Sequence, residues 1–476
     1  MQNRLKKRHE ARYFPPGLPT NRLRQKFSQS VGLPIREALP EDEIEAALEA
    51  EDIIYRRCLL DPVVTIWAFL SQVLDSDRSC RKAISRVFAY LSDTKEVADP
   101  MDLIESQSDT GAYCKARQRL SQPVLDRLYR SVATNQEESA EKDRLWCGRR
   151  VFLGDGTTVL MPDTQENQAA HPQHPNQKAG CGFPLAKLVA IFSLTTGAII
   201  EAITDVWSAY EPALLRQISG FFKPFDVFVA DRIYCTYADI VLLKNRLVDS
   251  VLRLHQARKV DFRKGKRLGK YDHIFIWEKP KRCPKALAKH LYDLLPNTLT
   301  VRVLRFTINQ KGFRSRQITV VTTLLDPIAF PKAEIARLYG LRWEAEINLR
   351  HLKSSMEMDF LRTKSPEMIQ KELAIYFLAY NLIRSLMTKA ALRYGKDPLR
   401  LSFKGTLQHL NTFLPLLAVS GLKKRQQHYE MLLLLIAREQ LPDRPGRVEP
   451  RMVKRRPKWS RWLQEPRTVL KQKLSA

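Results

Sequence analysis

The first 145 residues alternate polar and apolar positions at helical spacing. An acidic, alanine-rich segment covers 41–52, and Pro62 then opens a strongly apolar segment. A short basic stretch, 112–120, follows before Ser121, whose hydroxyl group suits the N-cap of a further helix. The pattern predicts a helical region over residues 1–145.

From residue 149 onwards, the pattern changes to short runs of β-branched and apolar residues. Three such runs are followed by a helical stretch, a fourth run, a second helical stretch and a fifth run that ends at residue 254. This order predicts a sheet whose strands are partly joined by helical crossovers. We therefore expect an α/β core whose first part covers residues 146–255.

A β-rich insertion is predicted to interrupt this core. Residues 256–325 are rich in strand-forming residues and in Lys and Arg, and the motif RKGKRLGK within them predicts an exposed loop. The core is expected to resume over residues 326–400. The remaining segment, 401–476, is predicted to begin with helices and to end in a basic tail that is weakly ordered without DNA: from Pro442 onwards it holds 11 Lys or Arg and 3 Asp or Glu.

The charge of the chain points to a polyanionic partner. Among 476 residues there are 79 Lys and Arg against 51 Asp and Glu, which gives a formal net charge of +28. Because such a protein repels itself unless an anion neutralises it, nucleic acid is favoured over a merely solvated basic surface. No apolar run is long enough to span a bilayer, and the N-terminus lacks the apolar segment of a signal peptide. We expect a cytoplasmic protein with no membrane association.

Zinc and disulfide chemistry are disfavoured. The seven cysteines form an odd set without a CxxC pair, so buried free thiols are predicted instead of a zinc ribbon or a disulfide framework. His171, His174 and Cys181 lie close together in the sequence, but no second pair has zinc spacing. A polar loop is therefore the favoured interpretation of that stretch.

One predicted helix combines an acid, two cations and a phenol. After Pro331 a long helix is expected to reach Met356, and it contains Tyr339, Arg342, Glu346 and Lys353. At helical spacing the last three lie within roughly 60° of Tyr339. A carboxylate beside cations suits a site that holds a metal ion and a phosphate together. The alternative is an ordinary charged helix face with an intrahelical ion pair.

Two further acids lie in or at the ends of predicted strands. Asp155 occurs in GDGTTV, in or just after the first strand, and Asp231 occurs in FVADRIY, at the end of the fourth. Either residue alone is best explained as a turn or N-cap aspartate. Together with Glu346 they form a possible site for divalent cations, and hard oxygen ligands favour Mg²⁺ or Mn²⁺ over zinc.

These motifs resemble those of a known family. The spacing Y-x2-R-x3-E-x6-K, from Tyr339 to Lys353, is similar to the signature of the IS-four family of bacterial insertion-sequence transposases, which are enzymes of the DDE type. The segments around Asp155 and Asp231, and the motifs NQKAGCGFPLAKLVAIFSL and LRLHQAR, also resemble family segments. The resemblance implies a ribonuclease H-like catalytic core interrupted by a β-rich insertion.

The resemblance also implies roles for these residues. Asp155, Asp231 and Glu346 would be the catalytic acids and would hold two Mg²⁺ or Mn²⁺ ions. Tyr339, Arg342 and Lys353 would bind DNA phosphates. Some relatives form a hairpin and stack an aromatic side chain of the insertion on a flipped base, which makes Trp277 and Phe313 candidates, although packing within the sheet is favoured for both.

The implied function is cut-and-paste DNA transposition. The expected partners are double-stranded DNA, namely the terminal inverted repeats of the element and the target, and a second copy of the chain in a synaptic homodimer near the bacterial nucleoid. Three alternatives remain: a ribonuclease H-like nuclease or resolvase that cuts without joining, an inactive transposase-derived DNA-binding protein, and a basic structural nucleic-acid binder. Three intact acids, Asp155, Asp231 and Glu346, disfavour the last two.

Overall fold

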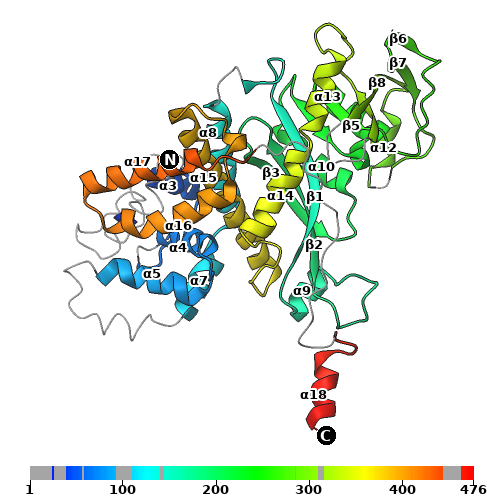
Figure 1. Cartoon of the computed structure of the whole chain (residues 1–476). Coiled ribbons are helices and arrows are strands. Elements are labelled where there is room, and N and C mark those ends of the chain that lie inside the picture. The colour runs from blue at the N-terminus through cyan, green and yellow to red at the C-terminus, as the bar shows by residue number, and fades with distance from the viewer. Residues whose placement is uncertain are drawn as a thin grey trace, which may run out of the picture. The chain divides into compact units, whose positions relative to one another are not determined.

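The chain divides into two compact units. The computed structural model describes residues 24–25, 39–55, 58–92, 110–139, 144–284, 286–308, 316–442 and 462–475 (Figure 1). Unit 1 comprises Met1–Val132 and Gln370–Gln440, and unit 2 comprises Ala133–Ile369 and Leu441–Ala476. Unit 1 is built of helices and unit 2 contains a mixed sheet with helices, so the expected α/β class and the helical N-terminal region are confirmed.

The helices of unit 1 enclose an apolar centre. In α4, nearly every side chain is buried, including Trp67 and Phe69. The helix begins where the sequence indicates, because Pro62 occupies its first turn and the Asp61 carboxylate accepts a hydrogen bond from the Val64 N–H at 2.9 Å. The helices are α3 (Glu41–Ala50), α4 (Pro62–Leu74), α5 (Cys80–Ser92), α7 (Thr110–Arg119), α8 (Gln122–Glu138), α15 (Pro366–Arg393), η5 (Pro398–Arg400), α16 (Phe403–Val419) and α17 (Leu422–Arg438), with α8 and α15 running from one unit into the other.

Unit 2 is organised around a nine-stranded sheet of order β3-β2-β1-β4-β5-β9-β8-β7-β6 (Figure 1). The strands β1, β2 and β3 are antiparallel neighbours, whereas β4 is parallel to β1 and β5 is parallel to β4. The remaining pairs are antiparallel. The strands are β1 (Val151–Leu160), β2 (Leu185–Ser193), β3 (Ile199–Val206), β4 (Val227–Ala230), β5 (Asp249–Arg253), β6 (Lys266–Gly269), β7 (Asp272–Glu278), β8 (Thr298–Ile308) and β9 (Arg316–Thr322).

Helices connect and cover these strands. Helix α14 contacts β1 and β2, and α10 contacts β2 and β3. The all-buried strand β4 explains the apolar run that precedes Asp231, because a strand covered on both faces does not alternate. The helical elements are α9 (Gln165–Ala170), α10 (Glu211–Ile218), η2 (Ser219–Phe221), η3 (Arg232–Tyr234), α11 (Tyr237–Asn245), α12 (Lys289–Asp293), α13 (Lys332–Gly340), α14 (Trp343–Arg350), the π-helical turn η4 (His351–Ser355) and α18 (Arg467–Ser475).

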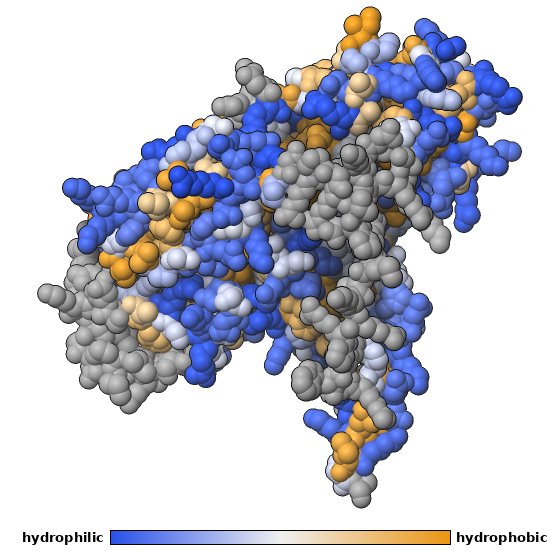
Figure 2. All heavy atoms as spheres, in the orientation of Figure 1, coloured by the Kyte–Doolittle hydropathy of each residue, from blue (hydrophilic) through white to orange (hydrophobic). Residues whose placement is uncertain are grey.

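The predicted insertion extends the sheet of the core. Strands β6–β9 lie within it, and β9 pairs with β5, so the nine strands are continuous. The motif RKGKRLGK, predicted to be a loop, contains β6, because residues on either side of the turn at Tyr271 pair in the β6–β7 ladder. Figure 2 shows hydrophilic residues over most of the visible face of the region that carries β6–β8.

A buried ion pair ties this extension to the chain that leaves it. Arg302 on β8 has no exposed surface, and its Nη2 lies 2.6 Å from the Asp272 carboxylate on β7. Its Nη1 donates to the backbone carbonyl of Phe330 at 2.7 Å. Arg302 therefore links two strands of the insertion to the segment just before α13.

The long helix expected from Pro331 to Met356 is interrupted. Helix α13 ends at Gly340, α14 begins at Trp343, and the last turn is π-helical. Leu341 and Arg342 keep right-handed helical backbone angles. The two helices are therefore joined by a turn and not by extended chain. Glycine lowers helix propensity, and a break this short leaves the apolar spacing almost unchanged.

Part of the predicted basic tail is helical. Residues 467–475 of the basic tail form α18. All seven cysteines are free, as predicted, but only Cys235 is buried, whereas Cys58 and Cys147 are exposed. A search of the described residues finds no helix with the length and apolar character needed to cross a membrane.

Candidate active site

The two aspartates occupy matching positions on neighbouring strands. Gly154 of β1 and Ala230 of β4 are paired in parallel register, and Asp155 and Asp231 are the residues that follow them. The Asp155 carboxylate accepts a hydrogen bond from the Gly156 N–H at 2.9 Å. Asp231 caps the short helix η3 by accepting from the Arg232 N–H, so its local role is the N-cap expected of an isolated aspartate. The sheet nevertheless brings both acids to one place.

Both glycines around Asp155 allow close packing. A Cβ atom added to Gly154 would lie 2.6 Å from the ring of Phe228, and one added to Gly156 would lie 2.5 Å from the carboxyl group of Glu211. The packed ring of Phe228 therefore favours glycine at position 154, whereas a side chain at position 156 would require the Glu211 carboxyl group to move.

The signature residues on α14 and η4 face strand β1. Arg342 donates from Nη2 to Oε1 of Glu346 at 2.7 Å, and Lys353 donates from Nζ to the hydroxyl oxygen of Thr157 at 3.2 Å. Thr157 lies two residues after Asp155 and therefore points to the same face of the strand. The expected intrahelical ion pair is present, and Lys353 lies beside the strand that carries Asp155.

Electrostatic coupling connects the acids to the signature helix. Burial raises the pKa of Asp155 to about 6, its bond to Gly156 and the charge of Arg342 oppose that rise, and the charges of Glu346 and Glu211 add to it. Burial likewise raises the pKa of Tyr339 to about 12, Arg342 opposes the rise, and the charge of Asp231 adds to it. The side chain of Tyr339 is buried, with its ring edge-on to Phe306. Burial also lowers the pKa of Lys353.

The three acids of the site offer only oxygen atoms as metal ligands, which fits a hard divalent cation. Carboxylates at Asp155, Asp231 and Glu346 match the ligand preference of Mg²⁺ or Mn²⁺. The Glu346 carboxylate is paired with Arg342, and within the described ranges no three His, Cys, Asp or Glu side chains are close enough to form a ready metal site. Metal ligation by these acids would therefore require the Arg342–Glu346 pair to rearrange.

Glu211 is an acid of this region that sequence reasoning missed. Its Oε2 accepts a hydrogen bond from the Tyr234 hydroxyl at 3.1 Å, and its Oε1 lies 3.3 Å from Nζ of Lys187. Glu211 thereby links Lys187 on β2, the strand that pairs with β1, to Tyr234 on η3, the short helix that follows Asp231. In the sequence, Glu211 opens a helix in front of a proline, and an acid there is explained by the helix dipole alone. No sequence signal distinguishes it, nor Thr157, from structural residues.

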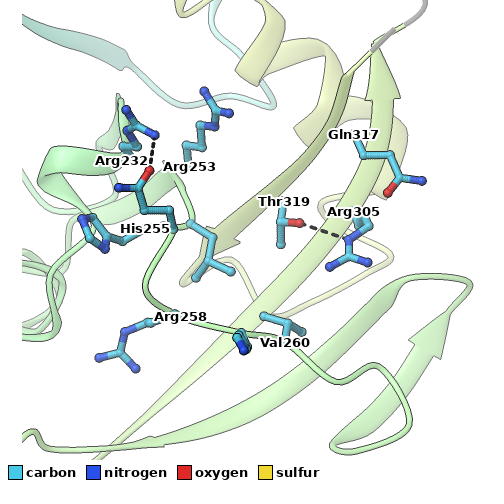
Figure 3. A pocket seen from close by; sticks show the side chains of 11 residues that line it. Arg232, Arg253, His255, Arg258, Val260, Arg305, Gln317 and Thr319 are labelled. Atoms are coloured by element: carbon cyan, nitrogen blue, oxygen red, sulfur yellow. Dashed lines mark hydrogen bonds between the residues drawn. The ribbon is translucent and has the colours of Figure 1, made fainter.

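A basic pocket with a volume of about 470 Å³ lies next to this region (Figure 3). Arg232, which follows Asp231, donates to Oε1 of Gln256 at 2.7 Å, and Arg305 donates to the hydroxyl oxygen of Thr319 at 3.1 Å. Much of the wall comes from the LRLHQAR segment. The lining contains no acidic residue and consists of Arg232, Arg253, Leu254, His255, Gln256, Arg258, Lys259, Val260, Arg305, Gln317 and Thr319.

Of the two aromatic candidates for base stacking, Trp277 lies in the part of the chain that the structure describes. Trp277 is partly buried against the core cluster of unit 2, and the Arg258 guanidinium lies 4.1 Å from the centre of its ring. Trp277 is thus a packed sheet residue beside the basic pocket. Phe313 lies outside the described residues.

The stretch with His171, His174 and Cys181 has the character of a polar loop. His171 is buried, which lowers the pKa of its imidazole, and its backbone carbonyl accepts from the Leu185 N–H at 3.1 Å. The ring of His174 lies 4.5 Å from that of Trp207. Both histidines therefore have structural explanations.

Replacing Asp155 by Asn is expected to stabilise the metal-free protein at high pH. An unfolded Asp loses its proton near pH 3.9, at about its ordinary pKa, whereas the folded group retains it up to its raised pKa of about 6. Stability therefore falls as the pH rises between these values, and the full cost persists above them. Melting curves should show the Asp155→Asn variant to be more stable by roughly 1–3 kcal/mol at neutral to alkaline pH, with no gain in strong acid. Equal gains at both pH values would contradict a buried carboxyl group.

Comparison with known proteins places these residues in a family. The sequence profile "Transposase DDE domain" matches residues 146–382, which include both aspartates and the signature. The chain is 27% identical to the transposase InsG for insertion sequence element IS4 of Escherichia coli (strain K12) over 418 residues, 86% of this chain and 88% of that protein. A cryo-electron microscopy structure of the piggyBac transposase synaptic complex with hairpin DNA aligns with 88% of this chain and 85% of its own, with a TM-score of 0.41 and 9% identity. The chain belongs to the IS-four family of DDE transposases.

Proposed function

We propose that this transposase cleaves DNA at the ends of its insertion sequence and joins the freed 3′ hydroxyl groups to target DNA. The observation that carries the proposal is the parallel pairing of β1 with β4, which brings Asp155 and Asp231 to matching positions beside the helix that bears Glu346. We further propose that β1–β5, in the order β3-β2-β1-β4-β5, are the ribonuclease H-like core, with 256–325 as its insertion. The predicted boundaries at 1–145, 326–400 and 401–476 remain part of this proposal.

Enzymes of the DDE family depend on divalent metal ions. We assign Asp155, Asp231 and Glu346 as the residues that hold two Mg²⁺ or Mn²⁺ ions. When bound, such ions lower the pKa of an attacking water and stabilise the leaving 3′ oxygen. In the structure Arg342 holds the Glu346 carboxylate beside β1, and release of this pair would free the carboxylate for a metal ion and the guanidinium for a phosphate.

Tyr339, Arg342 and Lys353 are proposed to bind phosphates of the element end. Arg342 and Lys353 contribute positive charge on the face of α14 and η4 that meets β1, and one Arg342 nitrogen is engaged by Glu346. A guanidinium has five N–H donors, so it can bind a phosphate and a carboxylate together. The neutral, buried phenol of Tyr339 can donate a hydrogen bond.

Arg342→Ala is expected to weaken binding of the element end and to slow cleavage together. Its partly exposed pair with Glu346 contributes only about 0.3–0.5 kcal/mol to stability, so thermal unfolding should change little. Arg342→Lys should also lose activity, since a point charge replaces a bidentate fork. End-DNA affinities and melting curves measured on the same preparations decide the matter. Normal affinity with reduced stability would leave Arg342 only a structural role.

The basic pocket supports DNA as the partner. Arg253→Ala should weaken DNA binding and reduce the slope of log affinity against log salt by roughly 0.9, the value for one duplex phosphate contact. Lys244→Ala, which removes an exposed cation at the end of α11 outside the pocket, is the matched control and should leave the slope unchanged. The same slope in both variants would show that Arg253 does not contact phosphate.

Base stacking by Trp277 or Phe313 remains a proposal for a hairpin step. The Arg258 guanidinium covers one face of the Trp277 ring. A flipped base could stack on that face only after the guanidinium has moved away. The pocket next to that arginine would provide cations for the adjoining phosphates.

The proposed partners are the terminal inverted repeats of the element, the target DNA and a second copy of the chain. We propose a homodimer in the synaptic complex, working in the bacterial cytoplasm at the nucleoid. The net charge of +28 supports a nucleic-acid partner.

Incubation of the purified protein with Mg²⁺ and DNA that carries the ends of its own element separates the candidate functions. Cut ends covalently joined to target DNA are expected. Cut but never joined ends would indicate a ribonuclease H-like nuclease, and bound but uncut ends would indicate an inactive DNA-binding descendant.

A further inference from the structure

Two cysteine thiols in unit 1 lie next to each other. Cys80 is the first residue of α5 and Cys114 belongs to α7, and their sulfur atoms are 3.9 Å apart. Both residues are partly exposed, so a small reagent can reach them. A disulfide needs a separation of about 2 Å, so the two sulfur atoms must approach each other further before they can bond.

A buried cation completes the cluster. The Arg117 Nη2 lies 3.2 Å from the Cys80 sulfur and 3.5 Å from the Cys114 sulfur. The guanidinium lies over the rings of Phe69 and Tyr113, 4.9 Å from each centre. In the part of the chain that the structure describes, no carboxylate pairs with this guanidinium, and its hydrogen-bond acceptors are the two sulfurs.

The positive charge of Arg117 offsets part of the cost of forming an anionic sulfur in this partly buried setting. Burial raises the pKa of the Cys80 thiol, and the charge of Arg117 opposes that rise. The guanidinium is only 7% exposed and contacts both sulfur atoms, so it is placed to attract the negative charge of the attacking sulfur. The thiolate is the nucleophile in thiol–disulfide exchange.

We propose that Cys80 and Cys114 are a redox modification site at which a low-molecular-weight disulfide, such as oxidised glutathione, produces a reversible intramolecular disulfide. One cysteine thiolate attacks the reagent, forms a mixed disulfide and releases one thiol. The second cysteine attacks the mixed disulfide and releases the other thiol. Two protein thiols are oxidised, one reagent disulfide is reduced to two thiols, and the two cysteine protons end on the released thiols.

A soft metal ion is the competing occupant of a dithiol. The adjacent guanidinium repels a cation, and within the described residues no third His, Cys, Asp or Glu completes a metal-binding group. The cluster therefore favours disulfide exchange over metal binding.

The test uses the full-length protein with oxidised glutathione, followed by intact mass and peptide mapping without reductant. We expect a crosslinked peptide that joins Cys80 to Cys114, the loss of two hydrogen atoms, and full reversal by dithiothreitol. The exposed Cys58 and Cys147 should take up glutathione as mixed disulfides only. Cys80→Ser and Cys114→Ser should each leave the remaining partner as a mixed disulfide, while Cys147→Ser should retain the crosslink.

The rate at which the crosslink forms tests the role of Arg117. Arg117→Lys keeps a charge and should still form the crosslink, whereas Arg117→Met should form it about tenfold more slowly, with folding checked by circular dichroism. Separate mixed disulfides at Cys80 and Cys114 in the wild-type protein, or a crosslink from either to another cysteine, would overturn the proposal. Protection of both thiols from alkylation by Cd²⁺, with no crosslink on oxidation, would also overturn it in favour of a metal site.

Discussion

Single replacements Asp155→Ala, Asp231→Ala and Glu346→Gln should each abolish DNA cleavage, to below about a thousandth of the wild-type rate. The two Asp→Ala variants remove carboxylate oxygens assigned to the metal ions, and Glu346→Gln replaces a carboxylate by a neutral amide, which is a much weaker ligand. The two aspartates follow paired residues of β1 and β4, and Glu346 lies on the helix that contacts β1, so each acid occupies its own position around the proposed metal ions. Cleavage rates on end DNA at saturating Mg²⁺ measure the effect.

Folding and end binding should survive these replacements. Glu346→Gln loses only a partly exposed ion pair with Arg342, and the aspartates are not part of an apolar core. Glu278→Gln, which alters an exposed carboxylate on β7, is the matched control and should cleave normally. Near wild-type cleavage by any one of the three acid variants would show that the acid is wrongly assigned.

Arg302→Ala should destabilise unit 2 by about 3–5 kcal/mol. The replacement leaves the Asp272 carboxylate without its partner at a site where Arg302 is fully buried, and it removes donors from the backbone carbonyls of Phe330 and Leu324. A buried carboxylate without a partner is far costlier than a lost surface pair. Chemical denaturation with a probe in unit 2 measures the change.

Two further variants identify the cause. Arg267→Ala removes an exposed arginine on β6 and should be nearly neutral. The double replacement Asp272→Leu with Arg302→Met removes both charges and should recover part of the stability, though not all, because the carbonyls remain without donors. A loss below about 1 kcal/mol for Arg302→Ala would mean that the pair does not anchor the insertion.

The strands of the core were predictable because their side-chain patterns are local. The runs around Asp155 and Asp231 are bounded by turn residues and appear as β1 and β4. Pairing between distant strands is not encoded in such patterns, so the continuity of β5 with β9 had no sequence signal. The strand in RKGKRLGK was missed because its exposed, charged side chains resemble those of a loop.

The candidate site was predictable in its motif and not in its contacts. The spacing from Tyr339 to Lys353 predicts a helix that carries the signature residues. The interruption after Gly340 changes the path of that helix but not the spacing of the residues in the sequence. Contacts between Lys353 and Thr157, or between Glu211 and Tyr234, join residues far apart in the chain. Only the fold brings such pairs together.

A sulfur atom in place of a non-bridging oxygen at the scissile phosphate tests most directly whether metal ions held by the three acids act on that phosphate. Mg²⁺ binds sulfur poorly, whereas Mn²⁺ accepts it better. The expected result is cleavage slowed by about a hundredfold or more in Mg²⁺ for one stereoisomer and largely restored in Mn²⁺, with no restoration in Asp155→Ala. Equal rates for the sulfur and oxygen substrates in both metals, for both stereoisomers, would contradict a metal-bound scissile phosphate.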